Sequence, residues 1–121
     1  MVSGDPITME TVLRVVPEYI RNTEPLNDTV ARIISAVASH YRIKADDILG
    51  KDRKKNIQTA RNVSMYLVRP VTGASFPQIG VFFYRDHSTV HSNVAKVESE
   101  IAADAVFEAN VNEILKEIRR V

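Results

Sequence analysis

An aspartate followed by a helically spaced row of apolar residues is the feature that most restricts the fold of this chain. Asp86 can cap a helix because its carboxylate accepts hydrogen bonds from the free N–H groups of the first turn. Behind it, apolar side chains recur at intervals of four, three and four residues, the spacing of a helix with one buried face. These residues are Val90, Val94, Val97 and Ile101. The sequence therefore predicts a helix that begins after Asp86.

Helical spacing extends over almost the whole sequence, and no segment shows the alternation expected of a strand. The predicted helices span residues 7–22, 28–41, 45–49, 58–69, 76–83, 87–101 and 104–120. A proline restricts the backbone of the preceding residue, so Pro70 is expected to stop or bend the helix that reaches Arg69. The predicted fold class is all-α.

Two of these helices form a predicted helix-turn-helix. Ser75 and Asp86 precede a short and a longer helix as caps, and about three residues separate the two helices. In this motif the N-terminal end of the second helix enters the major groove of DNA. Here that end carries His87 and Ser88, small hydrogen-bonding side chains that suit contact with base edges.

Positive charge is concentrated in the middle of the chain. Residues 51–96 contain eight basic and two acidic side chains, a net charge of +6, whereas residues 1–50 carry −2 and residues 97–121 carry −3. A cationic region between anionic flanks is typical of a surface that binds a polyanion. Because this region includes the predicted helix-turn-helix, the pattern favours DNA as the polyanion.

Several other functions are disfavoured by the residues present. The 121 residues include no cysteine, which excludes disulfides and thiolate metal sites. His40, His87 and His91 share no face with a carboxylate, so no metal site is expected. Asp86, His87 and Ser88 diverge on one helical turn and cannot form a catalytic relay. With no glycine-rich phosphate loop and no apolar run near the ~20 residues of a membrane span, we expect no enzyme, no cofactor and no membrane span.

Two neighbouring motifs carry a resemblance to a known family. Ser75–Gly80 and Phe83–Val90 resemble the Ser-Leu-Pro-Glu-Ile-Gly and Gly-Gly-Arg-Asp-His-Ser/Thr-Thr-Val segments of the DNA-binding domain of the DnaA family of bacterial replication initiators. Upstream, Val37–Leu49 is similar to the first helix and following turn of that domain, and Lys51–Arg61 to its basic loop. Ile7–Glu24 is similar to the last helix of the neighbouring ATPase domain.

This resemblance implies a Trp-repressor-like helix-turn-helix domain of about six helices at residues 25–121, preceded by a linker helix. Residues 1–24 would be the end of the ATPase lid and its hinge. The implied partner is double-stranded DNA, at DnaA boxes of a replication origin, in the bacterial cytoplasm and nucleoid. ATP and Mg would belong to the ATPase domain of the parent protein, which oligomerises on DNA. The isolated fragment is expected to be a monomer.

The resemblance also implies roles for individual residues. The implied contacts to bases are made by Arg53 in the minor groove and, in the major groove, by Asp86, His87, Ser88 and Thr89. The implied contacts to phosphates are made by Lys54, Lys55, Arg61, Asn62, Arg69, Phe76, Pro77, Arg85 and Lys96.

The chain departs from the family pattern at the turn. Phe83 and Tyr84 replace a glycine pair whose backbone can adopt positive φ, so the turn must differ or one aromatic residue must accept that conformation. Ala60, Asn62 and Pro70 also replace usual residues.

Three classes of function fit the sequence, of which a sequence-specific DNA-binding module of a replication initiator is favoured. The alternative is a stand-alone helix-turn-helix regulator, or a DnaA paralogue with a different operator. The third class is a helical protein-interaction domain that has lost DNA binding. It stays open because Phe83 and Tyr84 replace the glycine pair of the turn.

Overall fold

The computed structural model describes residues 25–120, and this part of the chain is built from helices without strands. The helices are α3 (Leu26–Tyr41), α4 (Ala45–Leu49), α5 (Lys55–Thr72), α6 (Phe76–Phe83), α7 (His87–Ala103) and α8 (Ala105–Arg119). The all-α prediction is therefore confirmed for this part. The helix expected at residues 7–22, with its hinge, lies outside the described residues.

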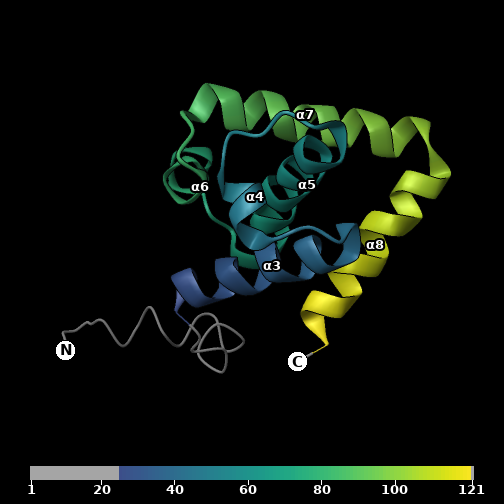
Figure 1. Cartoon of the computed structure of the whole chain (residues 1–121), viewed down its shortest axis with the longest axis horizontal. Coiled ribbons are helices and arrows are strands. Elements are labelled where there is room, and N and C mark those ends of the chain that lie inside the picture. The colour runs from purple at the N-terminus through teal and green to yellow at the C-terminus, as the bar shows by residue number, and fades with distance from the viewer. Residues whose placement is uncertain (1–24, 121) are drawn as a thin grey trace, which may run out of the picture.

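The helices surround α5, which lies at the centre of the domain (Figure 1). Helix α7 crosses one side of α5 and α3 crosses the other, while α6 and α8 lie at opposite ends of α7. Helices α3, α5, α7 and α8 each give at least three buried side chains to one continuous core, and α6 gives two, Ile79 and Phe83. Fully buried members with large side chains include Ile33, Ile48, Met65, Leu67, Ile79 and Phe83.

Helix α5 departs from its predicted limits at both ends. It begins at Lys55, three residues before the predicted start at Gln58, and continues past Pro70 to Thr72. A proline within a helix costs ~3 kcal/mol, but Val71 beyond it packs against the core. The hydroxyl of Thr72 donates to the carbonyl of Val68 at 2.7 Å. Tertiary packing therefore maintains the final turn. Of the two outcomes expected at Pro70, a stop or a bend by Arg69, the stop does not occur.

The predicted caps are formed by local side-chain bonds. Ser75 precedes α6, where its Oγ accepts from the Gln78 N–H at 3.3 Å and its own N–H donates to Gln78 Oε1 at 2.9 Å. This reciprocal capping box satisfies two main-chain donors that a helix start leaves open. Asp104 caps α8 in a related way, accepting from Val106 and Phe107.

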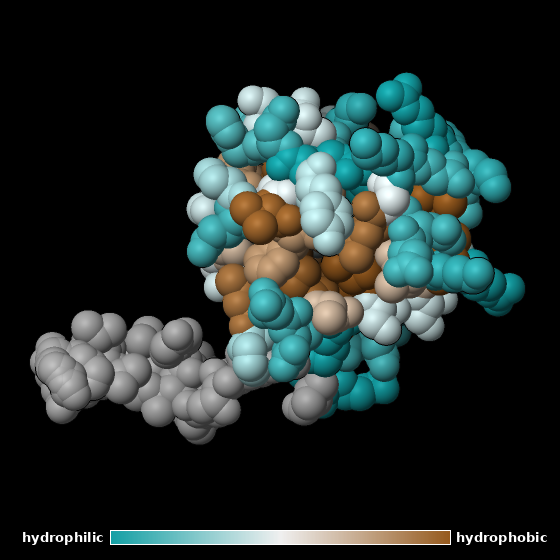
Figure 2. Space-filling model, turned by 60° about the vertical axis from the view of Figure 1, so that its left-hand side comes forward, coloured by the Kyte–Doolittle hydropathy of each residue, from teal (hydrophilic) through white to brown (hydrophobic). Residues whose placement is uncertain are grey.

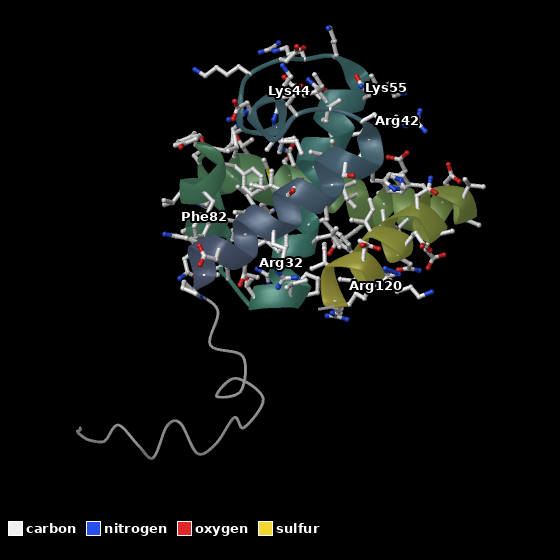
Figure 3. All side chains as sticks on the ribbon, turned by 60° about the horizontal axis from the view of Figure 1, so that its bottom comes forward. Arg32, Arg42, Lys44, Lys55, Phe82 and Arg120 are labelled. Carbon is white, nitrogen blue, oxygen red and sulfur yellow. The ribbon has the colours of Figure 1, made fainter. Side chains whose placement is uncertain are left out.

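The surface is mixed in character. Figure 2 shows hydrophobic side chains gathered on the face that carries α6, surrounded by polar ones. Among exposed hydrophobic residues, Val81 of α6 is 74% exposed. Figure 3 labels Lys55, Lys44 and Arg42 at one edge of the view and Arg120 at the end of α8. Within residues 25–120 no helix is long and apolar enough to cross a membrane.

Candidate nucleic-acid interface

The turn between α6 and α7 consists of three residues, Tyr84 to Asp86. Tyr84 adopts the left-handed conformation, with φ 58° and ψ 43°. The Arg85 N–H then donates to the Gly80 carbonyl at 2.9 Å, as in a Schellman motif. An aromatic residue therefore takes the positive φ that glycine adopts more readily, which is the second of the two outcomes expected for this turn.

Asp86 is the N-cap of α7, as predicted. Its Oδ1 accepts the Thr89 N–H at 2.8 Å. Hydrogen bonds from the backbone and side chain of Thr89 lower the pKa of the Asp86 carboxyl below its ordinary value of 3.8. The carboxylate is therefore ionised at neutral pH, and its negative charge faces the positive end of the α7 dipole.

The beginning of α7 is open to solvent. His87 and Ser88 are exposed, and Thr89 is half-buried. One face of the helix buries Val90, Val94 and Val97. The opposite face presents exposed residues with small side chains, namely Ser88, Ser92 and Ala95. This end of α7 can therefore approach another surface closely.

A cationic hollow lies beside the beginning of α7, and we call it the basic groove. Its volume is about 380 Å³. It is lined by Lys51, Arg53, Gln58, Arg61, Asn62, Tyr84, Arg85, Thr89, Asn93 and Lys96. Five of these residues are cationic and none is acidic, so the groove is a region of positive potential suited to phosphate. Six of them were predicted DNA contacts: Arg53, Arg61, Asn62, Arg85, Thr89 and Lys96.

Two arginines of the groove are occupied by main-chain carbonyls. Arg61 is 5% exposed, and its Nε donates to the Ile48 carbonyl at 2.7 Å while a terminal nitrogen donates to Asp47 at 3.0 Å. Burial, followed by the nearby charge of Arg85, lowers the pKa of this guanidinium. These bonds give Arg61 a structural role, and its expected phosphate contact stays a prediction.

Arg85 connects the turn between α6 and α7 to Gly50. Gly50 directly precedes residues 51–54, which form the basic loop of this structure. The Arg85 guanidinium donates to the Phe83 carbonyl at 2.8 Å and to the Gly50 carbonyl at 2.7 Å. Since Arg61 holds the end of α4 directly before Gly50, the two arginines fix the loop relative to α7. Arg85 therefore also supports the turn, its charge adds to the groove, and its expected phosphate contact stays a prediction.

A second group of predicted contacts lies at the start of α6. The Arg69 guanidinium stacks over the Phe76 ring at 4.4 Å from its centre. The same ring meets His91 edge-on, with centroids 5.1 Å apart. Pro77, Lys54 and Lys55 are exposed. Predicted phosphate contacts therefore lie on both sides of α7, at the basic groove and at the α6 start.

Sequence reasoning assigned no DNA contact to three groove residues: Lys51, Gln58 and Asn93. Helical spacing could have indicated two of them, because Gln58 precedes Asn62 by four residues and Asn93 follows Thr89 by four. Lys51 was counted in the charge but not assigned a contact. The position of Tyr84 depends on the turn conformation, which the sequence left open.

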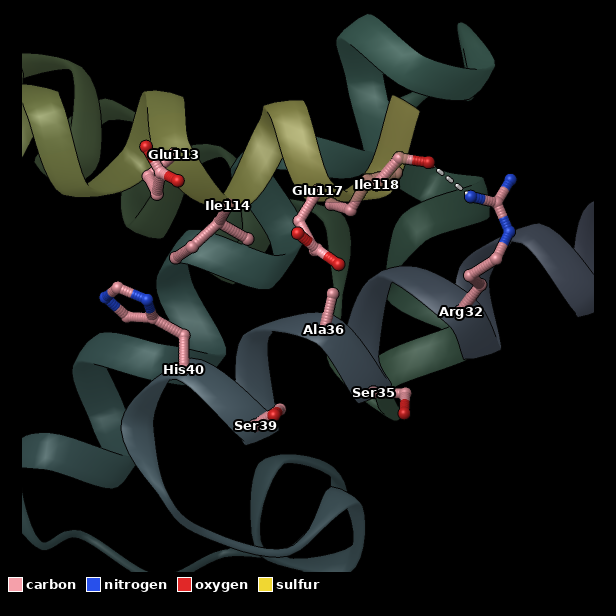
Figure 4. A pocket seen from close by; sticks show the side chains of 9 residues that line it. All are labelled: Arg32, Ser35, Ala36, Ser39, His40, Glu113, Ile114, Glu117 and Ile118. Carbon is pink, nitrogen blue, oxygen red and sulfur yellow. Dashed lines mark hydrogen bonds between the residues drawn. The ribbon is translucent and has the colours of Figure 1, made fainter. Parts of the chain in front are cut away.

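A larger hollow lies elsewhere, between α3 and α8 (Figure 4). Its volume is about 520 Å³, and its lining includes His40, Glu113 and Glu117. The Arg32 guanidinium donates to the Ile118 carbonyl across it. Within residues 25–120 no group of three metal-ligating side chains is found. Its two carboxylates make this hollow a poor site for a polyanion, so the basic groove is the candidate interface.

Comparison with a family model agrees with this assignment. Residues 30–97 match the family described as the bacterial dnaA protein helix-turn-helix. That range includes α4 to α6, the basic loop and the first part of α7.

Curated relatives extend the match along the chain. The chromosomal replication initiator protein DnaA of Citrifermentans bemidjiense is 36% identical over 118 residues, which cover 96% of this chain and 25% of the relative. The corresponding protein of Xanthobacter autotrophicus is 34% identical over 117 residues, 96% of this chain and 23% of the relative. The chain thus spans about a quarter of the length of these relatives.

Solved structures share the fold. A crystal structure of a DNA replication initiation factor superposes with a TM-score of 0.71 and 30% identity over 90% of this chain and 35% of that one. A replication initiator DnaA bound to AMPPCP and single-stranded DNA gives a TM-score of 0.64 and 28% identity over 90% and 36%.

Proposed function

Because the chain belongs to the bacterial DnaA helix-turn-helix family, we propose that it binds duplex DNA sequence-specifically, at the DnaA boxes of a replication origin. The single observation that carries this proposal is the exposed, capped beginning of α7 beside a groove with five cations and no acidic lining residue. A helix end that is open to solvent can enter a major groove while the cations neutralise phosphates on its flank.

In the proposed complex the residues at the beginning of α7 read bases. Asp86 accepts from a cytosine amino group, because a carboxylate that caps a helix still has lone pairs to offer. His87 and Ser88 exchange hydrogen bonds with base edges, and Thr89 contacts a thymine methyl group or a phosphate. Arg53, in the exposed basic loop, enters a narrow minor groove, where negative potential is strongest.

The proposed phosphate contacts fix the register of the protein on the duplex. They divide between the two sides of α7. The basic loop side supplies Lys54, Lys55, Asn62 and Lys96. The other side supplies Arg69, the main-chain N–H of Phe76 and the ring of Pro77, which has no N–H and contacts the DNA backbone only through its carbon atoms. Arg61 and Arg85 contribute charge and support.

The biological setting is part of the proposal. The domain would direct a longer initiator to the origin in the bacterial cytoplasm and nucleoid. ATP and Mg would be bound by an ATPase domain of that parent protein, which would oligomerise on DNA. Residues 1–24 would be the end of the ATPase lid and its hinge, and residues 25–121 the DNA-binding domain, a monomer when isolated.

The test is a titration with a DnaA-box nonamer duplex and with a scrambled duplex at several salt concentrations. His87→Ala should cost about 1–3 kcal/mol on the nonamer, roughly a 5- to 150-fold loss of affinity, and should reduce discrimination. Lys54→Ala is the control, because losing a phosphate contact weakens both duplexes alike and lowers the salt slope by about 1.

Unchanged discrimination by His87→Ala would show that this residue does not read bases. Preference of the unmodified chain for another operator would favour a stand-alone regulator, and equal binding to all duplexes would contradict sequence-specific recognition altogether.

A further inference from the structure

Tyr84 occupies a conformation that its residue type disfavours. With φ 58° and ψ 43° it lies in the left-handed region, where a Cβ atom approaches the neighbouring carbonyl. Glycine would meet no such penalty. A residue kept in this conformation is therefore expected to contribute something that glycine cannot.

The fold gains little from the Tyr84 side chain. The side chain is 73% exposed, and it takes no part in the hydrophobic core. Its hydroxyl has no hydrogen-bond partner among residues 25–120. Stability of the domain thus gives no reason for a tyrosine at this turn.

The surroundings of Tyr84 give a different reason. It lines the basic groove together with Lys51, Arg53 and Lys96, the cations that a DNA backbone would neutralise under the proposed function. A phenol can donate its O–H to a phosphate oxygen, and its ring can pack against deoxyribose.

The position of Tyr84 is also fixed relative to the basic loop. Its carbonyl accepts from Arg85 at 3.3 Å, and the same guanidinium donates to the Gly50 carbonyl, next to Lys51. Tyrosine has few rotatable bonds, so little entropy is lost when it becomes ordered on a partner.

We propose that Tyr84 positions duplex DNA in the basic groove. Its ring packs on a deoxyribose, and its hydroxyl donates to a phosphate of the strand that occupies the groove. The proposal rests on the proposed function. It adds to the interface a contact for which a glycine turn has no side chain.

The experiment compares Tyr84→Gly, Tyr84→Phe and Val81→Ala in duplex binding and thermal unfolding. Val81 is a matched control because it is also an exposed residue of this hairpin, 74% accessible, but does not line the groove. Tyr84→Gly should raise the unfolding temperature or leave it unchanged, yet weaken binding about 5- to 30-fold. Tyr84→Phe should lose only the hydroxyl contact, about 2- to 5-fold.

Both losses should be equal on nonamer and scrambled duplexes, since a backbone contact carries no sequence information. Unchanged affinity in Tyr84→Gly, while the unmodified chain still discriminates between the duplexes, would overturn this inference alone. A loss confined to the nonamer would also overturn it, by assigning Tyr84 to base reading. Failure of the unmodified chain to prefer the nonamer would instead refute the proposed function.

Discussion

Gly80 provides the sharpest test of how the helix-turn-helix is built. A Cβ atom added at this position would lie 2.3 Å from the main-chain carbonyl oxygen of Arg85, whereas ordinary contacts begin at 3.4 Å. The overlap is therefore about 1 Å, and rotation of a side chain cannot relieve it because the oxygen belongs to the backbone. We place this strain near the upper end of the 1–3 kcal/mol typical of overpacking, about 3 kcal/mol.

Gly80→Ala also gains about 1 kcal/mol of helix propensity within α6. The expected net loss of unfolding free energy is about 2 kcal/mol, a fall in unfolding temperature of roughly 8–16 °C for a domain of this size. Because relief of the strain must move Arg85 and the Asp86 cap, we also expect duplex affinity to fall by about tenfold or more, equivalent to 1.4 kcal/mol.

Gly73→Ala is the matched control. Gly73 has φ 76°, but an added Cβ there would meet nothing within 4 Å. That variant is penalised for its conformation by about 1–2 kcal/mol, and it should leave DNA binding intact. Both variants should be measured by urea and thermal unfolding and by duplex titration. An unfolding temperature and a dissociation constant of Gly80→Ala equal to those of the unmodified chain would refute the close approach of Arg85 to α6.

Two further predictions concern the supports of the site. Asp86 has a folded-state pKa below 3.8, so its contribution to stability is complete above pH 3.8 and is lost as the pH falls through the folded-state pKa. Asp86→Asn retains a cap but does not titrate, so it should reduce the fall in unfolding free energy at acid pH, measured by urea unfolding from pH 2 to 6. An unchanged fall at acid pH would contradict this role of the Asp86 carboxylate. Arg61→Met leaves the carbonyls of Ile48 and Asp47 without their donor and should lower the free energy of unfolding in urea by about 2–4 kcal/mol. The control, Arg69→Met, removes an exposed guanidinium stacked on Phe76 and should lower it by only about 0.5–1 kcal/mol. Equal losses in the two variants would contradict a buried role for Arg61.

The parts of the fold that depend on neighbouring residues could be predicted from the sequence. Ser75 and Asp86 cap α6 and α7 through bonds to residues three positions away, and the valines of α7 define its buried face by spacing alone. These signals are local, so they need no knowledge of the remaining chain. The exposed beginning of α7 followed from the same pattern.

Other features depend on distant contacts and could not be predicted. Helix α5 passes Pro70 because Val71 packs against the core, which local propensity does not record. Arg61 reads as a free cation in a basic stretch, yet carbonyls 13 and 14 residues away hold it. For Tyr84 the sequence allowed a changed turn or a positive φ, and the structure has the positive φ.

The bonds of Arg61 and Arg85 have a consequence for the spacing of a target. Because these bonds hold both the end of α4 and Gly50, they fix the distance between the basic loop and the beginning of α7. The basic loop and the beginning of α7 therefore cannot move apart when their contact sites on the duplex are further separated. One base pair inserted between the minor-groove and major-groove halves of a nonamer would move one contact site by ~3.4 Å along the duplex and rotate it about the duplex axis. The domain could then contact either half of the site but not both.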